Sequence, residues 1–289
     1  MKVLMFGQTG QVATEMLRRH GHGLTVEALG RKSADLTDPA ACAAAVQASN
    51  ADLILNAAAY TAVDNAEDDE ATAHLVNAEA PGAMAQAAAA RGLPFLHVST
   101  DYVFDGTGET PWAEDAPTSP LGAYGRAKLA GEQAVQAAGG AHVILRTAWV
   151  HAAHGGNFVK TMLRLAAERD RLTIVADQRG GPTAARDIAS ALVEIIRAHG
   201  DGRGTSGIYH FCGAPAVSWH EFACEIFAQS SGKVPEVVPI PSADFPTKAP
   251  RPANSVLDCN KIARDYGIEQ PDWRQSLRGI LKELEGLET

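Results

Sequence analysis

Tyr124 and Lys128 stand four positions apart in the segment AYGRAKLAGEQAV. Its small residues, alanines and later glutamate predict a helix, on which these two side chains lie one turn apart on the same side. A tyrosine phenol has a pKa of about 10, and a nearby ammonium lowers that pKa by favouring the phenolate. Tyr124 could then donate a proton to a carbonyl oxygen as a hydride reaches the carbon. Taken alone, the same spacing also occurs on helices that do no chemistry.

A hydroxyl group from a neighbouring strand end could hold the substrate oxygen beside this phenol. The run HVST supplies Ser99 and Thr100, while His97 in the same apolar run is interpreted as a buried core residue. Lys128 would have a second task, which is to hold the ribose hydroxyls of a nicotinamide cofactor. The pattern therefore indicates a reductase, provided that the chain also binds a dinucleotide.

A glycine turn near the start of the chain, GQTGQVA, follows an apolar run and precedes an amphipathic segment. Gly7 permits the tight turn, Gly10 lets backbone amides approach a pyrophosphate, and the small Ala13 lets the helix lie close to the strand. The amino end of that helix offers free N–H groups to phosphate oxygens. Glycine is common in tight turns, but between a strand and a helix this pattern predicts nucleotide binding.

The end of the second predicted strand bears on which dinucleotide is bound. A carboxylate there would bind the ribose of NAD and repel the 2′-phosphate of NADP. In VEALGRKSADL, Glu27 falls inside the strand, and Arg31 and Lys32 stand at its end. The two cations favour NADPH, with NADH as the second choice, although both cations could instead be solvated surface charges.

Short apolar runs alternate with amphipathic segments through the first half of the chain. This rhythm predicts an α/β fold with a doubly wound parallel sheet of the Rossmann type over residues 1–150. The expected strands cover 2–6, 24–29, 52–57, 94–99 and 142–147, with one helix from Pro39 and another over 67–91. Ligands bind at the carboxyl ends of such strands, where the motifs above lie.

After about residue 150 the alternation loosens, and we expect residues 151–289 to form mainly a smaller, discontinuous C-terminal substrate lobe, with some segments returning to the core. Helices are predicted near 157–169, 184–199, 219–230 and 272–285, and strands at RLTIVA and GIYHF. The proline-rich stretch 235–252 is expected to be an ordered loop over a cleft or a flexible tether, because proline does not fit regular helix or central strand.

Composition narrows the function classes. The 289 residues carry a net charge of −9, which argues against broad binding to nucleic acid or to an anionic membrane. The cysteines are scattered without a CxxC pair, as is typical of reduced, buried thiols. The start MKVLMFGQTG reads as a strand, not a signal peptide, and no run reaches the ~18 apolar residues of a membrane span. We expect a cytoplasmic protein that acts on a small molecule.

Taken together, these motifs resemble those of a known protein family. The runs GQTGQV, NAAAYTAVDNAE, STDYVFDG, YGRAKLAGE, RTAWVH, NFVKTML, DQRGGPT, RPANSVLD and PDWRQSL occur in this order along the whole chain. In them the chain resembles the extended short-chain dehydrogenase/reductase superfamily and, within it, the dTDP-4-dehydrorhamnose reductases. The resemblance implies hydride transfer from NAD(P)H to carbon 4 of dTDP-4-dehydro-L-rhamnose. The product, dTDP-L-rhamnose, is a precursor of bacterial surface polysaccharide.

The resemblance also implies roles for individual residues. Those near the cofactor are Gly7, Gly10, Gln11 and Val12 at the pyrophosphate, Asp35 and Leu36 near the adenine, and Ala59, Tyr60 and Thr61 along the channel. Those at the substrate are Thr100, Tyr124 and Lys128 as the catalytic group, Asp101 and Trp149 at the hexose, and Arg251 and Asn254 in a closing loop over residues 251–255.

Three further points follow from this resemblance. Val256 stands where relatives commonly have arginine, so one polar substrate contact is missing. Some relatives are associated with Mg²⁺ at a dimer contact, which makes Glu15 a candidate ligand and a homodimer plausible. Two alternatives stay open: an epimerase or dehydratase that retains NAD⁺, disfavoured by Ala13 and the substrate lobe, and a non-catalytic regulatory subunit, disfavoured by the intact catalytic group.

Overall fold

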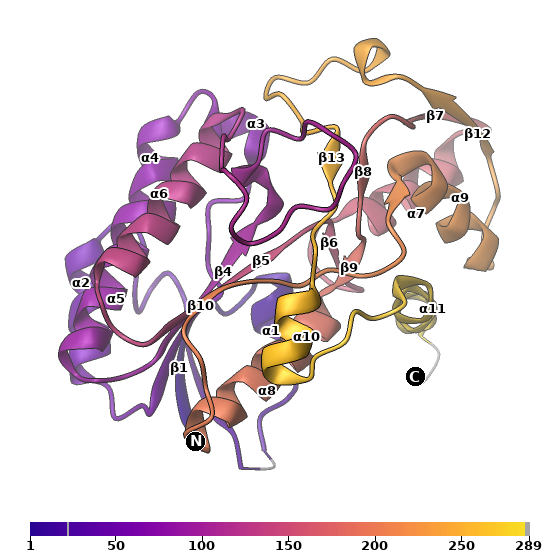
Figure 1. Ribbon diagram of the computed structural model, residues 1–289. Helices are drawn as coiled ribbons and strands as arrows, with labels where there is room; N and C mark the ends of the chain where they lie inside the picture. Colours follow the sequence, from indigo (N-terminus) through magenta and orange to yellow (C-terminus); the bar gives the residue numbers. More distant parts are fainter. Residues whose placement is uncertain (22, 287–289) are drawn as a thin grey trace.

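A six-stranded parallel sheet forms the centre of the molecule (Figure 1), in a computed structural model that describes residues 1–21 and 23–286. Across the sheet the order is β10 (Gly207–His210), β5 (His142–Thr147), β4 (Phe95–Thr100), β3 (Leu53–Asn56), β1 (Lys2–Phe6) and β2 (Thr25–Leu29). The predicted doubly wound fold and all six of these strands are confirmed. Because the chain turns from β2 back across β1 to β3, the strand order reverses there, and this reversal opens a crevice at the carboxyl ends.

Helices cover both faces of the sheet (Figure 1). One face carries α2 (Pro39–Ala48), α5 (Ala80–Ala90) and α6 (Ala123–Ala137), and the other carries α1 (Gln11–Leu17), α8 (Ala185–Gly200) and α10 (Asn260–Tyr266). Alternate residues of β1 serve the two sides, since Met5 packs with the α1 side and Phe6 with the α2 side. Strands buried on both faces explain the near-continuous apolar runs of the sequence.

The prediction of a single helix over 67–91 is wrong. The structure divides this region into α3 (Val63–Ala66), α4 (Glu70–His74), a π-helical segment η1 (Leu75–Glu79) and α5. Pro81 has no N–H to donate to the carbonyl of Asn77, one turn earlier, so the regular helical pattern cannot continue there. The side chain of Asn77 turns instead to the backbone of Tyr60.

The C-terminal lobe is built on its own apolar cluster. Its helices are α7 (Phe158–Glu168), α9 (Trp219–Gln229) and α11 (Trp273–Leu284), and its paired strands are β7 (Arg171–Val175) and β12 (Glu236–Ile240). Short strands complete it: β6 (Val150–His151), β8 (Arg179–Gly180), β9 (Thr183–Ala184), β11 (Val217–Ser218) and β13 (Asn254–Ser255). The proline-rich stretch is thus not all loop, since β12 includes Pro239, which a two-stranded edge pair accommodates.

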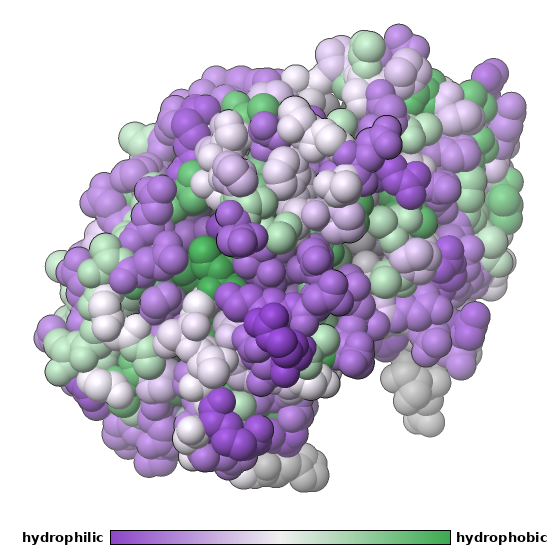
Figure 2. Space-filling view, in the orientation of Figure 1, coloured by the Kyte–Doolittle hydropathy of each residue, from purple (hydrophilic) through white to green (hydrophobic). Residues whose placement is uncertain are grey.

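Two elements of the second half return to the central sheet. β10 pairs with β5 along residues 207–210, and α8 packs against α1. The face shown in Figure 2 is mainly hydrophilic, with small and separate apolar patches. Among the described residues, no helix combines the length and the apolar character that crossing a bilayer requires.

Candidate active site

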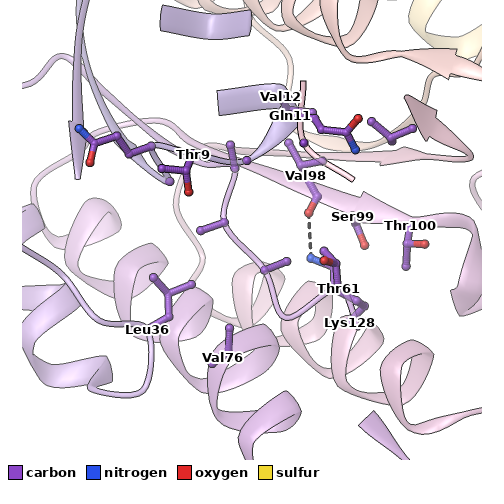
Figure 3. Close-up of a pocket in the computed structure, with 18 of the residues that line it drawn as sticks. Thr9, Gln11, Val12, Leu36, Thr61, Val76, Val98, Ser99, Thr100 and Lys128 are labelled. Atoms are coloured by element: carbon purple, nitrogen blue, oxygen red, sulfur yellow. Dashed lines mark hydrogen bonds between the residues drawn. The ribbon is translucent and has the colours of Figure 1, made fainter. Parts of the chain in front are cut away.

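A cavity of about 1130 Å³ lies at the carboxyl ends of the sheet strands. Its walls come from the loops after β1, β2, β3, β4 and β5, and from α6 (Figure 3). Arg31 lines it, as do most residues implied by the resemblance, namely Gly7, Gly10, Gln11, Val12, Asp35, Leu36, Ala59, Thr61, Thr100, Asp101, Tyr124, Lys128 and Trp149. The topology therefore brings the predicted nucleotide loop and the predicted catalytic group into one chamber.

Gly7 is required at the turn after β1. Its φ of +112° lies in the left-handed region, and a Cβ there would stand 3.2 Å from the carbonyl carbon of Ala57. Its N–H donates to the carbonyl of Leu29 at 2.9 Å, which ties the turn to the end of β2. A larger residue would be strained and would push the turn away from the loop after β3.

The predicted cofactor-selecting cations lie at the mouth of the cavity. The side chain of Arg31 is 84% exposed, and its Nε stands 4.0 Å from Oδ2 of Asp35. Hydrogen bonds from Thr37 hold the pKa of Asp35 below its usual range, and Arg31 contributes to this. Arg31 and Lys32 both line the cavity, so either can reach an anionic group placed there.

Thr100, the last residue of β4, faces Tyr124 of α6. The Thr100 hydroxyl donates to Oδ1 of Asp101 at 3.0 Å and accepts from the N–H of Tyr102 at 3.2 Å. The ring of Tyr102 meets the ring of Tyr124 edge to face, with 5.6 Å between centroids. These contacts fix the phenol between the strand end and the cavity.

The pKa of Tyr124 shifts upward, in the direction opposite to the lowering expected from Lys128. Burial raises the pKa of Tyr124 to about 12, with a smaller lowering effect from its hydrogen bond to Thr100. The ammonium does not counteract this, because Lys128 turns inward from the shared helix face, toward β4 (Figure 3). Tyr124 is therefore a neutral phenol over the ordinary pH range, and a neutral phenol has a proton to donate.

Lys128 is buried, with 1% of its surface exposed, and still lines the cavity. Its Nζ donates to the carbonyl of Val98 at 2.8 Å, the dashed contact of Figure 3, and lies 3.1 Å from Nε2 of His97. Burial lowers the pKa of Lys128 to about 8, although Glu132 opposes this. Of the two groups, the lysine therefore has the pKa closer to neutral pH.

Two buried oxygen atoms of the cavity wall, Oδ2 of Asp101 and Oγ1 of Thr147, have no hydrogen-bond partner among the residues that the structure describes. Burial raises the pKa of Asp101 to about 6, and the neighbouring Ser255 and Thr100, the latter donating to Oδ1, partly oppose this. Thr147 pairs with Thr100 in the register of β4 and β5, so its hydroxyl lies on the same side of the crevice. Unpartnered polar atoms in a cavity wall are suited to a polar ligand.

Three residues implied by the resemblance are not part of the cavity wall. Tyr60 packs with the alanines of α3, α4 and α6, and its backbone is held by Asn77. Arg251 donates to Oδ2 of Asp64 at 2.8 Å, and Asn254 donates to the carbonyl of Thr110 at 2.9 Å. Arg251 and Asn254 thus fasten the closing loop to the first domain. The sequence analysis expected these two side chains to contact the substrate.

Trp149 lines the cavity and has an unusual backbone conformation. Its φ is 49°, in the left-handed region that a bulky residue rarely adopts. The ring stacks on Trp219 with 3.5 Å between centroids, and a Cβ on Gly180 would stand 2.6 Å from it. Contacts from the C-terminal lobe therefore hold this aromatic surface in place.

Glu15 does not fit the role of a magnesium ligand. Its carboxylate accepts from Arg18 at 3.0 Å and lies 2.8 Å from Nε2 of His154, with Arg19 at 3.5 Å. A divalent cation would have to displace these partners and sit beside two guanidinium groups. Among the described residues, no group of three or more His, Cys, Asp or Glu side chains could hold a metal ion.

Sequence reasoning missed Asn77 and Thr147. The two hydrogen bonds of Asn77 to Tyr60, at 2.8 and 3.0 Å, fix the channel segment after β3. The only signal for Thr147 was its place at the end of an apolar run, in RTAWVH. A signal for Asn77 was Pro81, four residues later, which interrupts a regular helix. The sequence analysis treated this region as one uninterrupted helix.

Comparisons with known proteins agree with this geometry. The family model described as the RmlD substrate binding domain matches residues 1–285. The chain is 46% identical to a dTDP-4-dehydrorhamnose reductase of Burkholderia thailandensis, over 98% of this chain and 99% of that protein. Crystal structures of such reductases from Clostridium acetobutylicum (34% identity, TM-score 0.92, 99% and 100% coverage) and Bacillus anthracis with NADP (32%, 0.91, 98% and 99%) are also similar.

Proposed function

The chain belongs to the dTDP-4-dehydrorhamnose reductase family, whose activity is NADPH-dependent reduction, and we propose that Tyr124 is the proton donor of that reaction in this cavity. The substrate is a dTDP-linked 4-keto-6-deoxyhexose, with dTDP-4-dehydro-L-rhamnose first among them. NADPH supplies the hydride that adds to carbon 4. The oxygen of the ketone receives the phenolic proton, and the product is the 4-hydroxy sugar.

The described residues fit this cofactor. Gly7, Gly10, Gln11 and Val12 line the cavity at the turn after β1, where a pyrophosphate would meet them. Arg31 and Lys32 stand where a 2′-phosphate would face them, while Asp35 is engaged by Thr37. Lys128 would bind the ribose hydroxyls. No step requires Mg²⁺.

Each member of the catalytic group has a separate task. Tyr124 keeps its proton at neutral pH because burial raises the pKa of the phenol. Thr100 orients the phenol and would stabilise the phenolate left after transfer by turning its one hydroxyl proton from Oδ1 of Asp101 to that oxygen. The unpartnered Oδ2 of Asp101 would accept a hydrogen bond from a sugar hydroxyl, and Trp149 would cover the apolar face of the hexose.

The observation that carries the proposal is the meeting of Thr100, Tyr124 and Lys128 with the glycine turn in one cavity. The test is NADPH oxidation, followed by absorbance, with a panel of dTDP-4-keto-6-deoxyhexoses. We expect oxidation in proportion to keto sugar. Tightly held NAD with no net consumption would instead support an epimerase, and binding without turnover would support a regulatory subunit.

Arg31→Ala is expected to weaken NADPH binding by about 10–100-fold and NADH binding by less than twofold, because one charge-assisted hydrogen bond contributes about 1.5–3 kcal/mol. Dissociation constants from quenching of protein fluorescence measure both. Arg203→Ala, which removes an exposed arginine paired with Asp201, is the matched control and should change neither constant. Equal weakening of both cofactors by Arg31→Ala would contradict the 2′-phosphate assignment.

The pH profile should show an alkaline limb from the lysine, not from the tyrosine. As pH rises through about 8, Lys128 loses its charge, so kcat/KM for NADPH is expected to fall. Tyr124, with a pKa of about 12, stays protonated in that range. Lys128→Met should show low activity without this limb. A limb that persists in the variant would assign it to another group.

A further inference from the structure

His97 is buried in the middle of β4 and uses both of its ring nitrogens. Nδ1 lies 3.1 Å from Nδ2 of Asn56, the last residue of β3, and Nε2 lies 3.1 Å from Nζ of Lys128. The imidazole is only 1% exposed, and Asn56 is fully buried. A chain of three polar side chains therefore runs through the core from β3 to the catalytic lysine.

The orientation of the Asn56 amide follows from a backbone contact. The N–H of Ala58 donates to Oδ1 of Asn56 at 3.1 Å. A backbone N–H can only donate, so the amide oxygen must face Ala58 and the NH₂ group must face His97. Nδ1 of His97 therefore accepts a hydrogen bond.

This acceptor role fixes the tautomer of the ring. Burial, with the positive charge of Lys128, holds the pKa of His97 well below its usual value, so the ring is neutral and carries one N–H. Because Nδ1 accepts, the proton is on Nε2 and faces Nζ of Lys128. An ammonium group has no lone pair and cannot accept this hydrogen bond, whereas an amine can.

We propose that His97, locked by Asn56 with its Nε2–H toward Lys128, is a positioning residue that makes the catalytic lysine release its proton readily. The inference rests on the proposed function, in which Lys128 serves the reduction. Among the ionisable groups around the lysine, Glu132 on its own helix favours the ammonium, but Arg146 of β5 and Ser99 of β4 occupy that carboxylate. Tyr124, on the same helix, is neutral.

A lysine that releases its proton readily could resupply the proton that Tyr124 loses in the reaction. After each turnover the phenolate of Tyr124 must regain a proton, and a donor whose pKa is near the working pH exchanges protons best. An ordinary lysine has a pKa of about 10.4 and therefore stays protonated at neutral pH, so it is a poor proton donor for this task. His97 would thus convert a binding residue into an exchangeable proton source.

The first test reads the tautomer directly in cofactor-free protein. Two-dimensional ¹H–¹⁵N spectra of protein labelled in its histidine rings distinguish Nε2–H from Nδ1–H, and the signals that vanish in His97→Gln identify the residue. We expect a neutral ring protonated on Nε2. A ring protonated on Nδ1, or on both nitrogens, overturns the proposal.

The second test releases the lock without adding charge. In Asn56→Leu the ring proton is free to move to Nδ1, Nε2 then accepts from the ammonium, and the titration midpoint of Lys128 should rise by about one unit. The midpoint is measured from the ¹³Cε signal of labelled lysine, assigned with Lys128→Met. An unchanged or lower midpoint in folded Asn56→Leu overturns the proposal. Should this variant not fold, the tautomer of the wild-type ring decides.

Neither readout needs turnover, so the inference and the proposed function can fail separately. If the ring is protonated on Nε2 but the protein reduces no keto sugar, the proposed function is wrong and the hydrogen-bond assignment stands. Reduction by a protein with the opposite tautomer would do the reverse.

Discussion

Replacing Tyr124 by phenylalanine is expected to lower kcat by about 10²–10⁴-fold, the usual contribution of a positioned general acid. The ring, its packing against Tyr102 and the cavity wall are kept, and only the hydroxyl is lost. The ketone oxygen would then have to take its proton from water. Steady-state NADPH oxidation with a saturating dTDP-4-keto sugar measures the loss.

Two controls make this result specific. The dissociation constant for NADPH should change by less than about twofold, because the ring is not removed and Lys128 is untouched. Tyr102→Phe, which alters the neighbouring phenol in the same cavity, should keep far more activity than Tyr124→Phe. If the two variants lose activity equally, or if Tyr124→Phe turns over normally, the proton donor is another group.

Arg146→Met is expected to destabilise the protein by about 3–5 kcal/mol, because it leaves a buried carboxylate without its cation. Nη2 of Arg146 lies 2.6 Å from Oε2 of Glu132, and both side chains are almost fully buried, at 2% and 1% exposure. Ser99 also donates to this carboxylate, at 2.5 Å. The pair thus joins α6 to the strands next to Thr100. Urea unfolding followed by circular dichroism measures the change.

Arg203→Met is the matched control for this prediction. Arg203 forms a 3.0 Å ion pair with Asp201, but the side chains are 68% and 63% exposed. Exposed pairs contribute about 0–1 kcal/mol, so the expected loss is within that range. The double variant Arg146→Met with Glu132→Leu should regain part of the stability, since no buried charge remains. Equal losses for the two single variants would contradict a special role of the buried pair.

The parts of the fold that could be predicted are those written in local sequence. The turn at Gly7 has the glycine that its φ requires, and the strands at 2–6 and 142–147 have the bounds that their apolar runs predicted. The helix with Tyr124 and Lys128 was also foreseeable from its small residues. The π-helical segment was not, because it depends on one proline and on the backbone that Asn77 meets.

The electrostatics of the site could not be predicted in the same way. The spacing of Tyr124 and Lys128 places them on one helix face, but burial determines the pKa of the phenol. The lysine turns toward Val98 and His97, which lie on another element. Arg251 similarly meets Asp64, almost two hundred residues earlier in the chain. Such partners emerge only when distant segments are folded together.

The return of β10 to the central sheet has a consequence for how the chain folds during synthesis. While the ribosome is still making residues after 150, β5 has an open edge, with its N–H and C=O groups free to pair with another chain. This edge of β5 is covered only after residues 207–210 have left the ribosomal exit tunnel and paired with it as β10. We therefore expect a fragment truncated near residue 150 to aggregate when expressed, and a chaperone to be needed longest at this edge.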